Sequence, residues 1–296
     1  MTDDNRRSIR FKEWGVLVDT QKRPKSEQLQ GSDGTLLDAD FRLRTNNEGY
    51  IVSGNDLPNT GGKPKLITLG GSFVEALYAH ETDRFGSQME RNLNGSGMNL
   101  EVWNGGYSGS TLLHSFNVFI NKVIPSLRYV DQVIIFTAMS DQRTQVHTDS
   151  YWIKDKTHAP ILESRNSNIL QNRDATAEDQ ERLLNLFILA TRAYKHEPII
   201  VASPYRAAPF NEDEFTRRLH KTPEIYTESL RRLRMINDTA RKVSRRLSVT
   251  LWDADKELRG SAAYFYDSMH LNSDGQEKMS NFLSDRYLQH VHEASL

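Results

Sequence analysis

The stretch LITLGGSFVEALYA, residues 66–79, joins an apolar run to a segment with helical periodicity. Ser72 stands at the junction, after Gly70 and Gly71, which let the backbone turn tightly. If the apolar run is a strand of a parallel sheet, the serine lies at the carboxyl edge, where the next helix begins with free N–H groups. A hydroxyl there is a candidate nucleophile, although a serine that only caps a helix is the more common meaning of such a pattern.

The rest of the chain repeats this alternation of apolar run and amphipathic segment. The runs are rich in Val and Ile, as in strands that are covered on both faces; they are KLITLG (65–70), LEVWN (100–104), DQVIIFTA (131–138), PIIVAS (198–203) and SVTLWD (248–253). Helical periodicity follows each run, at about 73–93, 110–126, 177–196, 223–246 and 273–290. Five βα units predict a three-layer α/β/α fold around a parallel five-stranded sheet.

The first 62 residues have a different character, since they are polar and broken by Gly, Pro, Asn and Asp. The segments 14–20 and 41–54 predict short strands there. We therefore expect an N-terminal β extension over 1–62 and a larger α/β domain over 63–296.

Two connections in this domain are unusually long. Residues 141–176 and 204–222 follow the third and fourth strands, so both leave the carboxyl edge of the sheet, where open α/β folds bind ligands. They are either variable surface insertions or part of a site. Tyr151 and Trp152, in the first of them, line a substrate cleft or simply pack the loop down.

A second motif, YDSMHLNSDG, occupies residues 266–275. Asp267 and His270 are three residues apart, before a helix whose start Ser273 and Gln276 mark as a capping box. An aspartate so placed accepts from one imidazole nitrogen while the other nitrogen faces a hydroxyl. Because this motif follows the last strand and Ser72 follows the first, the two indicate a serine–histidine–aspartate arrangement at one edge.

A third motif, NGGYSGST, follows the second strand at residues 104–111. Asn104, Gly106 and Gly109 form a loop that could offer a backbone N–H to an oxyanion. An ordinary glycine-rich turn is the simpler alternative.

These motifs resemble those of one enzyme family. LGGSFVEA, NGGYSGST, TAMSDQ and YDSMHLN are similar, in this order, to the GDS, glycine-loop, GxND and DxxH blocks of the SGNH or GDSL hydrolases. RTNNEGY also resembles the R-x-N-x-x-G-[FY] stretch before GDS in many bacterial members, so the likeness covers residues 41–290. The resemblance implies a flavodoxin-like sheet, a triad of Ser72, His270 and Asp267, and oxyanion donors from the Ser72 and Gly109 backbones.

The sequence departs from the family pattern at two positions. Gly71 replaces the Asp of GDS, and Ser140 replaces the Asn of GxND, which is normally the third oxyanion donor. The shorter hydroxyl predicts a weakened or rebuilt oxyanion hole, in which a bound water or Asn104 takes the third place. Asp141 keeps the Asp of GxND. The residues expected to line the substrate cleft are Gly71, Asp141, Tyr151 and Trp152.

Composition excludes several other classes of protein. A net charge of -1 gives no electrostatic case for nucleic acid or a membrane surface. The sequence has no cysteine, no P-loop and no G-x-G-x-x-G, and Val74 stands where a G-x-S-x-G elbow needs its last glycine. The histidine pairs 147/158 and 290/292 are better read as solvated than as metal ligands, so we expect neither metal nor cofactor.

The leading hypothesis is a serine ester hydrolase that acts through an acyl-enzyme on an O-acyl ester of a sugar or small metabolite. An O-acyltransferase with the same triad, or a binding protein on the same scaffold, is the alternative. The start, MTDDNRRSIRFKEWG, has no apolar leader, and VIIFTAM (133–139) is too short to span a bilayer, so we expect a cytoplasmic protein. The oligomeric state is left open.

Overall fold

The computed structural model describes residues 7–54, 62–162 and 171–294. Its centre is a five-stranded parallel sheet in the order β5-β4-β6-β8-β9. The strands are β4 (Lys65–Gly70), β5 (Glu101–Gly106), β6 (Gln132–Phe136), β8 (Ile199–Val201) and β9 (Leu251–Trp252). Each coincides with one of the five apolar runs, so the predicted α/β fold and its parallel sheet are confirmed.

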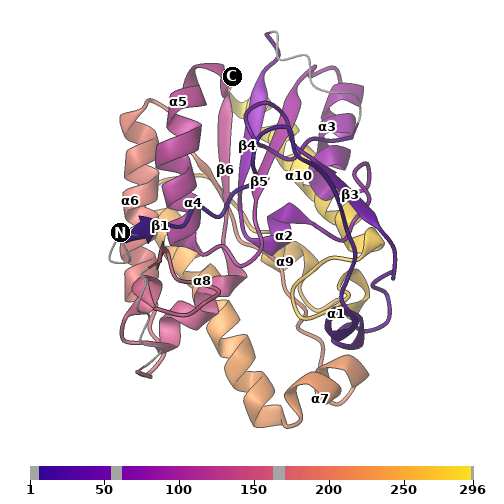
Figure 1. Ribbon diagram of the computed structural model, residues 1–296. Coiled ribbons are helices and arrows are strands. Elements are labelled where there is room, and N and C mark those ends of the chain that lie inside the picture. Colours follow the sequence, from indigo (N-terminus) through magenta and orange to yellow (C-terminus); the bar gives the residue numbers. More distant parts are fainter. Residues whose placement is uncertain (1–6, 55–61, 163–170, 295–296) are drawn as a thin grey trace, which may run out of the picture.

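Helices cover both faces of the sheet (Figure 1). One face packs on α4 (Leu112–Val118), α6 (Glu178–Ala193) and α8 (Pro223–Leu247). The other packs on α3 (Phe85–Gly95), α9 (Ala254–Leu258) and α10 (Ser273–Ala294). Strand β4 shows why its sequence does not alternate with polar residues: Leu66 belongs to the second core and Ile67 to the first. These two cores make the three predicted layers.

The predicted helix at 73–93 is wrong, because two helices occupy this stretch. Helix α2 is only Ser72–Glu75, and Ala76 ends it in the left-handed region at φ 48°. Helix α3 then begins at Phe85. The buried side chain of Arg84 holds the turn between them, since its guanidinium donates to the carbonyls of Ala76 and Arg42 at 3.2 and 2.6 Å. Apolar periodicity alone does not reveal such a buried tie.

The other helix predictions hold with shifted ends. The one at 110–126 contains α4, a π-helical turn (Phe119–Val123) and α5 (Ile124–Ser126), followed by a 3-10 turn at Leu127–Tyr129. The connection 204–222 carries α7 (Glu214–His220), which projects from the body together with the start of α8 (Figure 1). The connection 141–176 carries 3-10 turns at Met139–Val146 and Ser150–Trp152 and the strand β7 (Ile161–Leu162), while residues 163–170 of it lie outside the described part.

The N-terminal extension forms two small antiparallel pairs. Strand β2 (Asp19–Lys22) pairs with β3 (Phe41–Arg44), and β1 (Ser8–Ile9) pairs with β7. The predicted strand at 14–20 is therefore displaced, because Leu17 has a φ of 50° and the ladder begins only after it. The short helix α1 (Ser26–Gln30) lies between β2 and β3 and was not predicted. Residues 1–6 and 55–61 of the extension lie outside the described residues.

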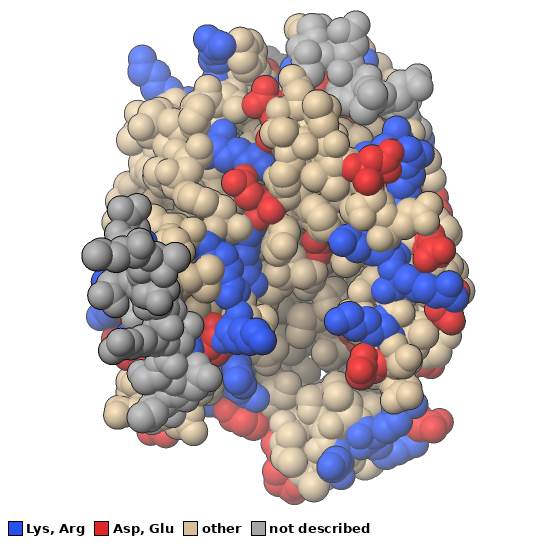
Figure 2. All heavy atoms as spheres, viewed as in Figure 1, with Lys and Arg blue, Asp and Glu red and all other residues tan. Residues whose placement is uncertain are grey.

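The surface seen in Figure 2 mixes positive and negative side chains and is hollowed below its centre. Over the described ranges, none of the helices has both the length and the apolar character that crossing a bilayer requires.

Candidate active site

The nucleophile candidate lies at the corner between β4 and α2. Ser72 is the first residue of α2, and Gly71 is its N-cap. The corner needs glycine at position 70, because a Cβ there would lie 2.5 Å from a methyl group of Val74. The GGS sequence thus brings a hydroxyl to the carboxyl edge of the sheet, as expected.

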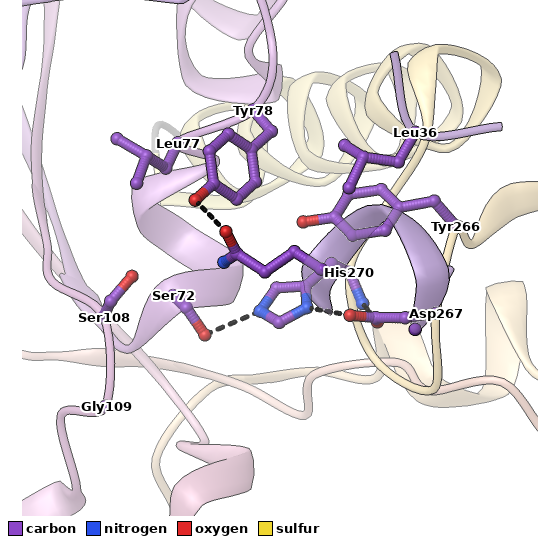
Figure 3. Close-up of a pocket in the computed structure, with 11 residues that line it drawn as sticks. Leu36, Ser72, Leu77, Tyr78, Ser108, Gly109, Tyr266, Asp267 and His270 are labelled. Carbon is purple, nitrogen blue, oxygen red and sulfur yellow. Dashed lines mark hydrogen bonds and ion pairs between the residues drawn. The ribbon is translucent and has the colours of Figure 1, made fainter. Parts of the chain in front are cut away.

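The structure brings Ser72, His270 and Asp267 into one hydrogen-bonded chain (Figure 3). The imidazole Nε2 lies 2.7 Å from Ser72 Oγ, and Nδ1 lies 2.6 Å from Asp267 Oδ2. The other carboxylate oxygen of Asp267 accepts from the backbone N–H groups of Met269 and His270 at 2.8 and 2.7 Å. The turn therefore fixes the carboxylate, the carboxylate orients the imidazole, and the imidazole faces the hydroxyl.

The helix after this turn begins differently from the prediction. Asn272, not Ser273, caps α10, since its Oδ1 accepts from the Gly275 N–H at 3.0 Å. Gln276 is used elsewhere: its Oε1 accepts from the Phe85 N–H at 2.8 Å and ties α10 to α3.

The environment keeps the imidazole basic. Burial by itself lowers the pKa of His270, but the carboxylates of Asp267 and Glu75 outweigh this and raise it above its ordinary value. Burial would raise the pKa of Asp267, but His270 and two backbone N–H groups lower it, so that carboxyl is ionised at neutral pH. The ring of Tyr266 stacks on the imidazole, with centroids 5.5 Å apart and planes 12° from parallel.

A pocket of about 290 Å³ opens beside the Ser72 hydroxyl. Its walls include Leu77 and Tyr78 from the segment after α2, and Tyr266 (Figure 3). The N-terminal extension supplies the other side through Gln28, Gly31 and Leu36. Gln28 is held in place by the Tyr78 hydroxyl, which donates to its Oε1 at 2.8 Å.

This contribution of the extension was not predicted from the sequence. A five-residue helix such as α1 is too short to show periodicity, and its contact with Tyr78 joins residues 50 positions apart. Glu75 was missed for another reason, because a glutamate in an amphipathic segment is usually solvated. Here its side chain is 1% exposed.

The glycine loop lies against α2, the helix that begins at Ser72. Gly106 has no room for a side chain, because a Cβ would lie 2.2 Å from the Glu75 nitrogen. Gly109 has a φ of 70°, and it lines the pocket together with Ser108 and Ser72. The two residues from which the resemblance implies oxyanion donors, Ser72 and Gly109, thus lie at one pocket.

We expect Gly106→Ala to destabilise the protein by about 3 kcal/mol, because the methyl group must displace the backbone of α2. Urea unfolding followed by far-UV circular dichroism measures this loss. Gly95→Ala is the matched control, since a Cβ at position 95 in α3 meets nothing within 4 Å. It should change the unfolding free energy by less than about 1 kcal/mol. Equal stability of the two variants would contradict the close contact.

Solved structures similar to this one include an esterase, an acylhydrolase and a lipolytic protein. An acetyl xylan esterase, AlAXEase, aligns with a TM-score of 0.53 and 14% identity, over 75% of this chain and 98% of its own. A lipase/acylhydrolase from Enterococcus faecalis aligns with 0.51 and 16%, over 75% and 94%. A lipolytic protein of the G-D-S-L family from Desulfitobacterium hafniense DCB-2 aligns with 0.50 and 12%, over 75% and 98%. No protein-family model and no curated protein matches the sequence.

The fold is that of the SGNH hydrolases. The resemblance inferred from the four sequence blocks is therefore confirmed for the fold. Ser72, the glycine loop and the Asp267–His270 turn stand at the carboxyl edge of this SGNH fold, which is the edge that the block order predicted.

Three residues proposed for the site are placed elsewhere in the SGNH fold. Asp141 is buried, and its two oxygens accept from the Leu112 N–H at 3.0 Å and the Tyr151 hydroxyl at 2.8 Å. Burial raises the pKa of Asp141 to about 7. Tyr151 is part of the core and belongs to the same buried cluster as Leu112 of α4. Trp152 is 54% exposed and is not among the residues that line the pocket.

Asn104 does not complete the oxyanion hole. Its side-chain Nδ2 donates to the Val74 carbonyl at 2.6 Å, and its Oδ1 accepts from the Gly106 N–H at 2.8 Å. The amide thus ties β5 to α2 and folds the glycine loop back on itself. The proposal of a direct Asn104 donor is wrong for this geometry.

Ser140 remains the residue at the third donor position of the SGNH pattern. It follows β6, the strand beside β4, so it lies at the same sheet edge as Ser72. We expect Ser140→Asn to raise kcat of ester hydrolysis by about tenfold or more, because the carboxamide supplies the longer donor. Steady-state kinetics on p-nitrophenyl acetate measure the change. A rate at or below that of the native protein would mean that another group, such as a bound water, already fills the position.

Within residues 7–54, 62–162 and 171–294, no group of three His, Asp or Glu side chains is arranged to hold a metal ion.

Proposed function

We propose that the protein is a serine ester hydrolase. The observation that carries the proposal is the chain from Ser72 Oγ to His270 to Asp267, at hydrogen-bond distances and in the wall of a pocket. In this chain, two residues that are 198 positions apart meet at 2.7 Å. A serine that only caps a helix, or a D-x-x-H turn that is only solvated, would require no such alignment.

In the first half of the reaction, His270 Nε2 takes the proton from Ser72 as the oxygen attacks the ester carbonyl. The carbonyl oxygen becomes an oxyanion that the N–H groups of Ser72 and Gly109 stabilise. His270 then gives its proton to the leaving alcohol as the ester C–O bond breaks. The acyl group remains on Ser72.

In the second half, His270 takes a proton from water, which attacks the acyl-enzyme. The collapse of this second oxyanion releases the acid, and the proton returns from His270 to Ser72. Asp267 stays ionised throughout and stabilises the imidazolium.

The pocket supports a compact ester with a polar alcohol as the substrate. Beside the reacting groups, its walls offer the polar side chains of Gln28, Tyr78 and Ser108. AlAXEase, one of the structures with this fold, is an acetyl xylan esterase. We therefore place acetyl esters of sugars or small metabolites first among the substrates to try.

The rate is expected to rise with pH. The imidazole acts as a base only when it is neutral, and its pKa is raised, so kcat/KM should be lost as the pH falls through a midpoint above the ordinary imidazole value of about 6.5. A pH profile of p-nitrophenyl acetate hydrolysis measures the midpoint. A midpoint below 6 by this assay would contradict the arrangement around His270.

The test of the function is hydrolysis of p-nitrophenyl acetate by the native protein and by Ser72→Ala. The native protein should release acetate and Ser72→Ala should not, while Ser96→Ala, at the exposed end of α3, should retain the native rate. An added xylo-oligosaccharide separates hydrolysis from transfer: acetylated sugar in place of free acetate would favour the O-acyltransferase. No turnover and no transfer from any acetyl ester by the native protein would favour a binding protein.

A further inference from the structure

The N-terminal segment 10–14 lies on the glycine loop and reaches it through Lys12. The ammonium of Lys12 donates to the carbonyl of Gly109 at 2.9 Å and to the carbonyl of Ser108 at 3.3 Å. Only 6% of this lysine is exposed. A Cβ on Gly109 would lie 2.7 Å from the same nitrogen, so Lys12 closes one side of the loop tightly.

The bond to Ser108 matters because of the geometry of the peptide unit. The Ser108 carbonyl and the Gly109 N–H belong to one planar trans peptide, in which C=O and N–H point in opposite directions. An ammonium that binds the carbonyl thus turns the N–H to the other side of the loop. The positive charge also polarises the peptide, and a polarised N–H is the stronger donor.

We propose that Lys12 is a positioning residue that aims and strengthens the Gly109 N–H as an oxyanion donor. The inference rests on the proposed ester hydrolase, because only a reaction through an oxyanion uses this N–H. It gives the N-terminal extension an indirect part in the chemistry, through the Gly109 peptide.

A second set of contacts holds the same loop from the nucleophile side. The buried carboxylate of Glu75 accepts from the Ser108 hydroxyl and, at 2.9 Å, from Trp14 Nε1. The ring of Trp14 also packs on that of Tyr107, with centroids 5.5 Å apart. Segment 10–14 and helix α2 therefore both bind the loop. The peptide between Ser108 and Gly109 has little freedom to rotate as a result.

The charge of Lys12 is balanced by groups around it. Burial, the largest influence, and Arg10 lower the pKa of Lys12, while Asp155 and Glu75 raise it; together they lower it to about 8. At neutral pH the ammonium is therefore charged in a site with two carbonyl acceptors.

Lys12→Met tests the inference, because it keeps an apolar stem and removes the ammonium. Lys122→Met is the matched control. Lys122 is also a largely buried lysine that donates to two backbone carbonyls, those of Trp14 at 3.4 Å and Gly49 at 2.9 Å, so it anchors the same segment without touching the loop. The readouts are kcat and KM for p-nitrophenyl acetate, and the affinity for phenylboronic acid, which forms a tetrahedral adduct with an active-site serine.

We expect Lys12→Met to lower kcat by about tenfold to hundredfold, with KM within about twofold. Its affinity for phenylboronic acid should fall by a similar factor. Lys122→Met should lower the melting temperature but keep kcat within about threefold of the native value. A merely structural role of Lys12 would lower stability without this selective loss of adduct binding.

Equal losses of kcat in the two variants, or native kcat and boronate affinity in Lys12→Met, would overturn the inference. If Lys12→Met does not fold, Lys12→Gln takes its place with the same expected direction and the same overturning result. A native protein that hydrolyses acetate esters while the Lys12 variants are unimpaired overturns this inference alone. A native protein without any esterase or transfer activity overturns the proposed function and this inference together.

Discussion

His270→Ala is expected to lower kcat for p-nitrophenyl acetate by about 10⁴-fold to 10⁶-fold. Among the described residues, the imidazole of His270 is the base hydrogen-bonded to Ser72, so its removal leaves Ser72 without this base and the leaving alcohol without this proton donor. The loss should appear in kcat, with KM changed far less, because the imidazole acts on the transition state. Steady-state kinetics, corrected for the hydrolysis that occurs without the protein, measure the loss in kcat.

His292→Ala is the control, since His292 is exposed near the end of α10. It should keep the native rate, and both variants should keep the native circular dichroism spectrum. A His270→Ala protein that retains a tenth of the native kcat would show that another base serves Ser72.

Asp267→Asn is expected to lower kcat by about 10³-fold to 10⁴-fold at neutral pH. The amide can present an NH₂ group to Nδ1 where the carboxylate accepted a hydrogen, and this favours the tautomer with the hydrogen on Nε2. That tautomer donates to Ser72 and cannot take its proton. The loss of the negative charge also removes a cause of the raised pKa of His270, so the acid limb of the rate should move to lower pH.

A pH profile of the Asp267→Asn variant measures both effects. Asp274→Asn, a substitution in the first turn of α10 and away from the imidazole, is the comparison and should leave rate and midpoint in place. A variant with an unchanged midpoint and less than a tenfold loss would mean that Asp267 neither orients nor charges the imidazole.

The sheet and its order of βα units were predictable because each central strand is buried on both faces. Such strands must be continuously apolar, and this pattern is visible in every one of the five runs. The hydrogen-bonded arrangement of Ser72, His270 and Asp267 was predictable for a related reason. The bond between Asp267 and His270 is local, and the parallel sheet brings the ends of its strands to the same edge as Ser72.

Contacts between distant segments were not predictable from pattern. The break after α2 depends on the buried Arg84, whose guanidinium binds a carbonyl 42 residues away. The bond of Lys12 to Gly109 spans 97 residues, and nothing in FKEWG marks this lysine as buried. Asp141 was expected in the cleft because it belongs to the TAMSDQ block, whereas its bond to Tyr151 holds it in the core. Each of these residues looks solvated in sequence and is buried by packing.

The most direct measurement is the site of covalent labelling by a fluorophosphonate probe. We predict one adduct, located on Ser72 by peptide mass spectrometry, that is absent in Ser72→Ala and much slower to form in His270→Ala. A native protein that stays unlabelled, or that carries the probe on a different residue, would contradict an activated Ser72 hydroxyl.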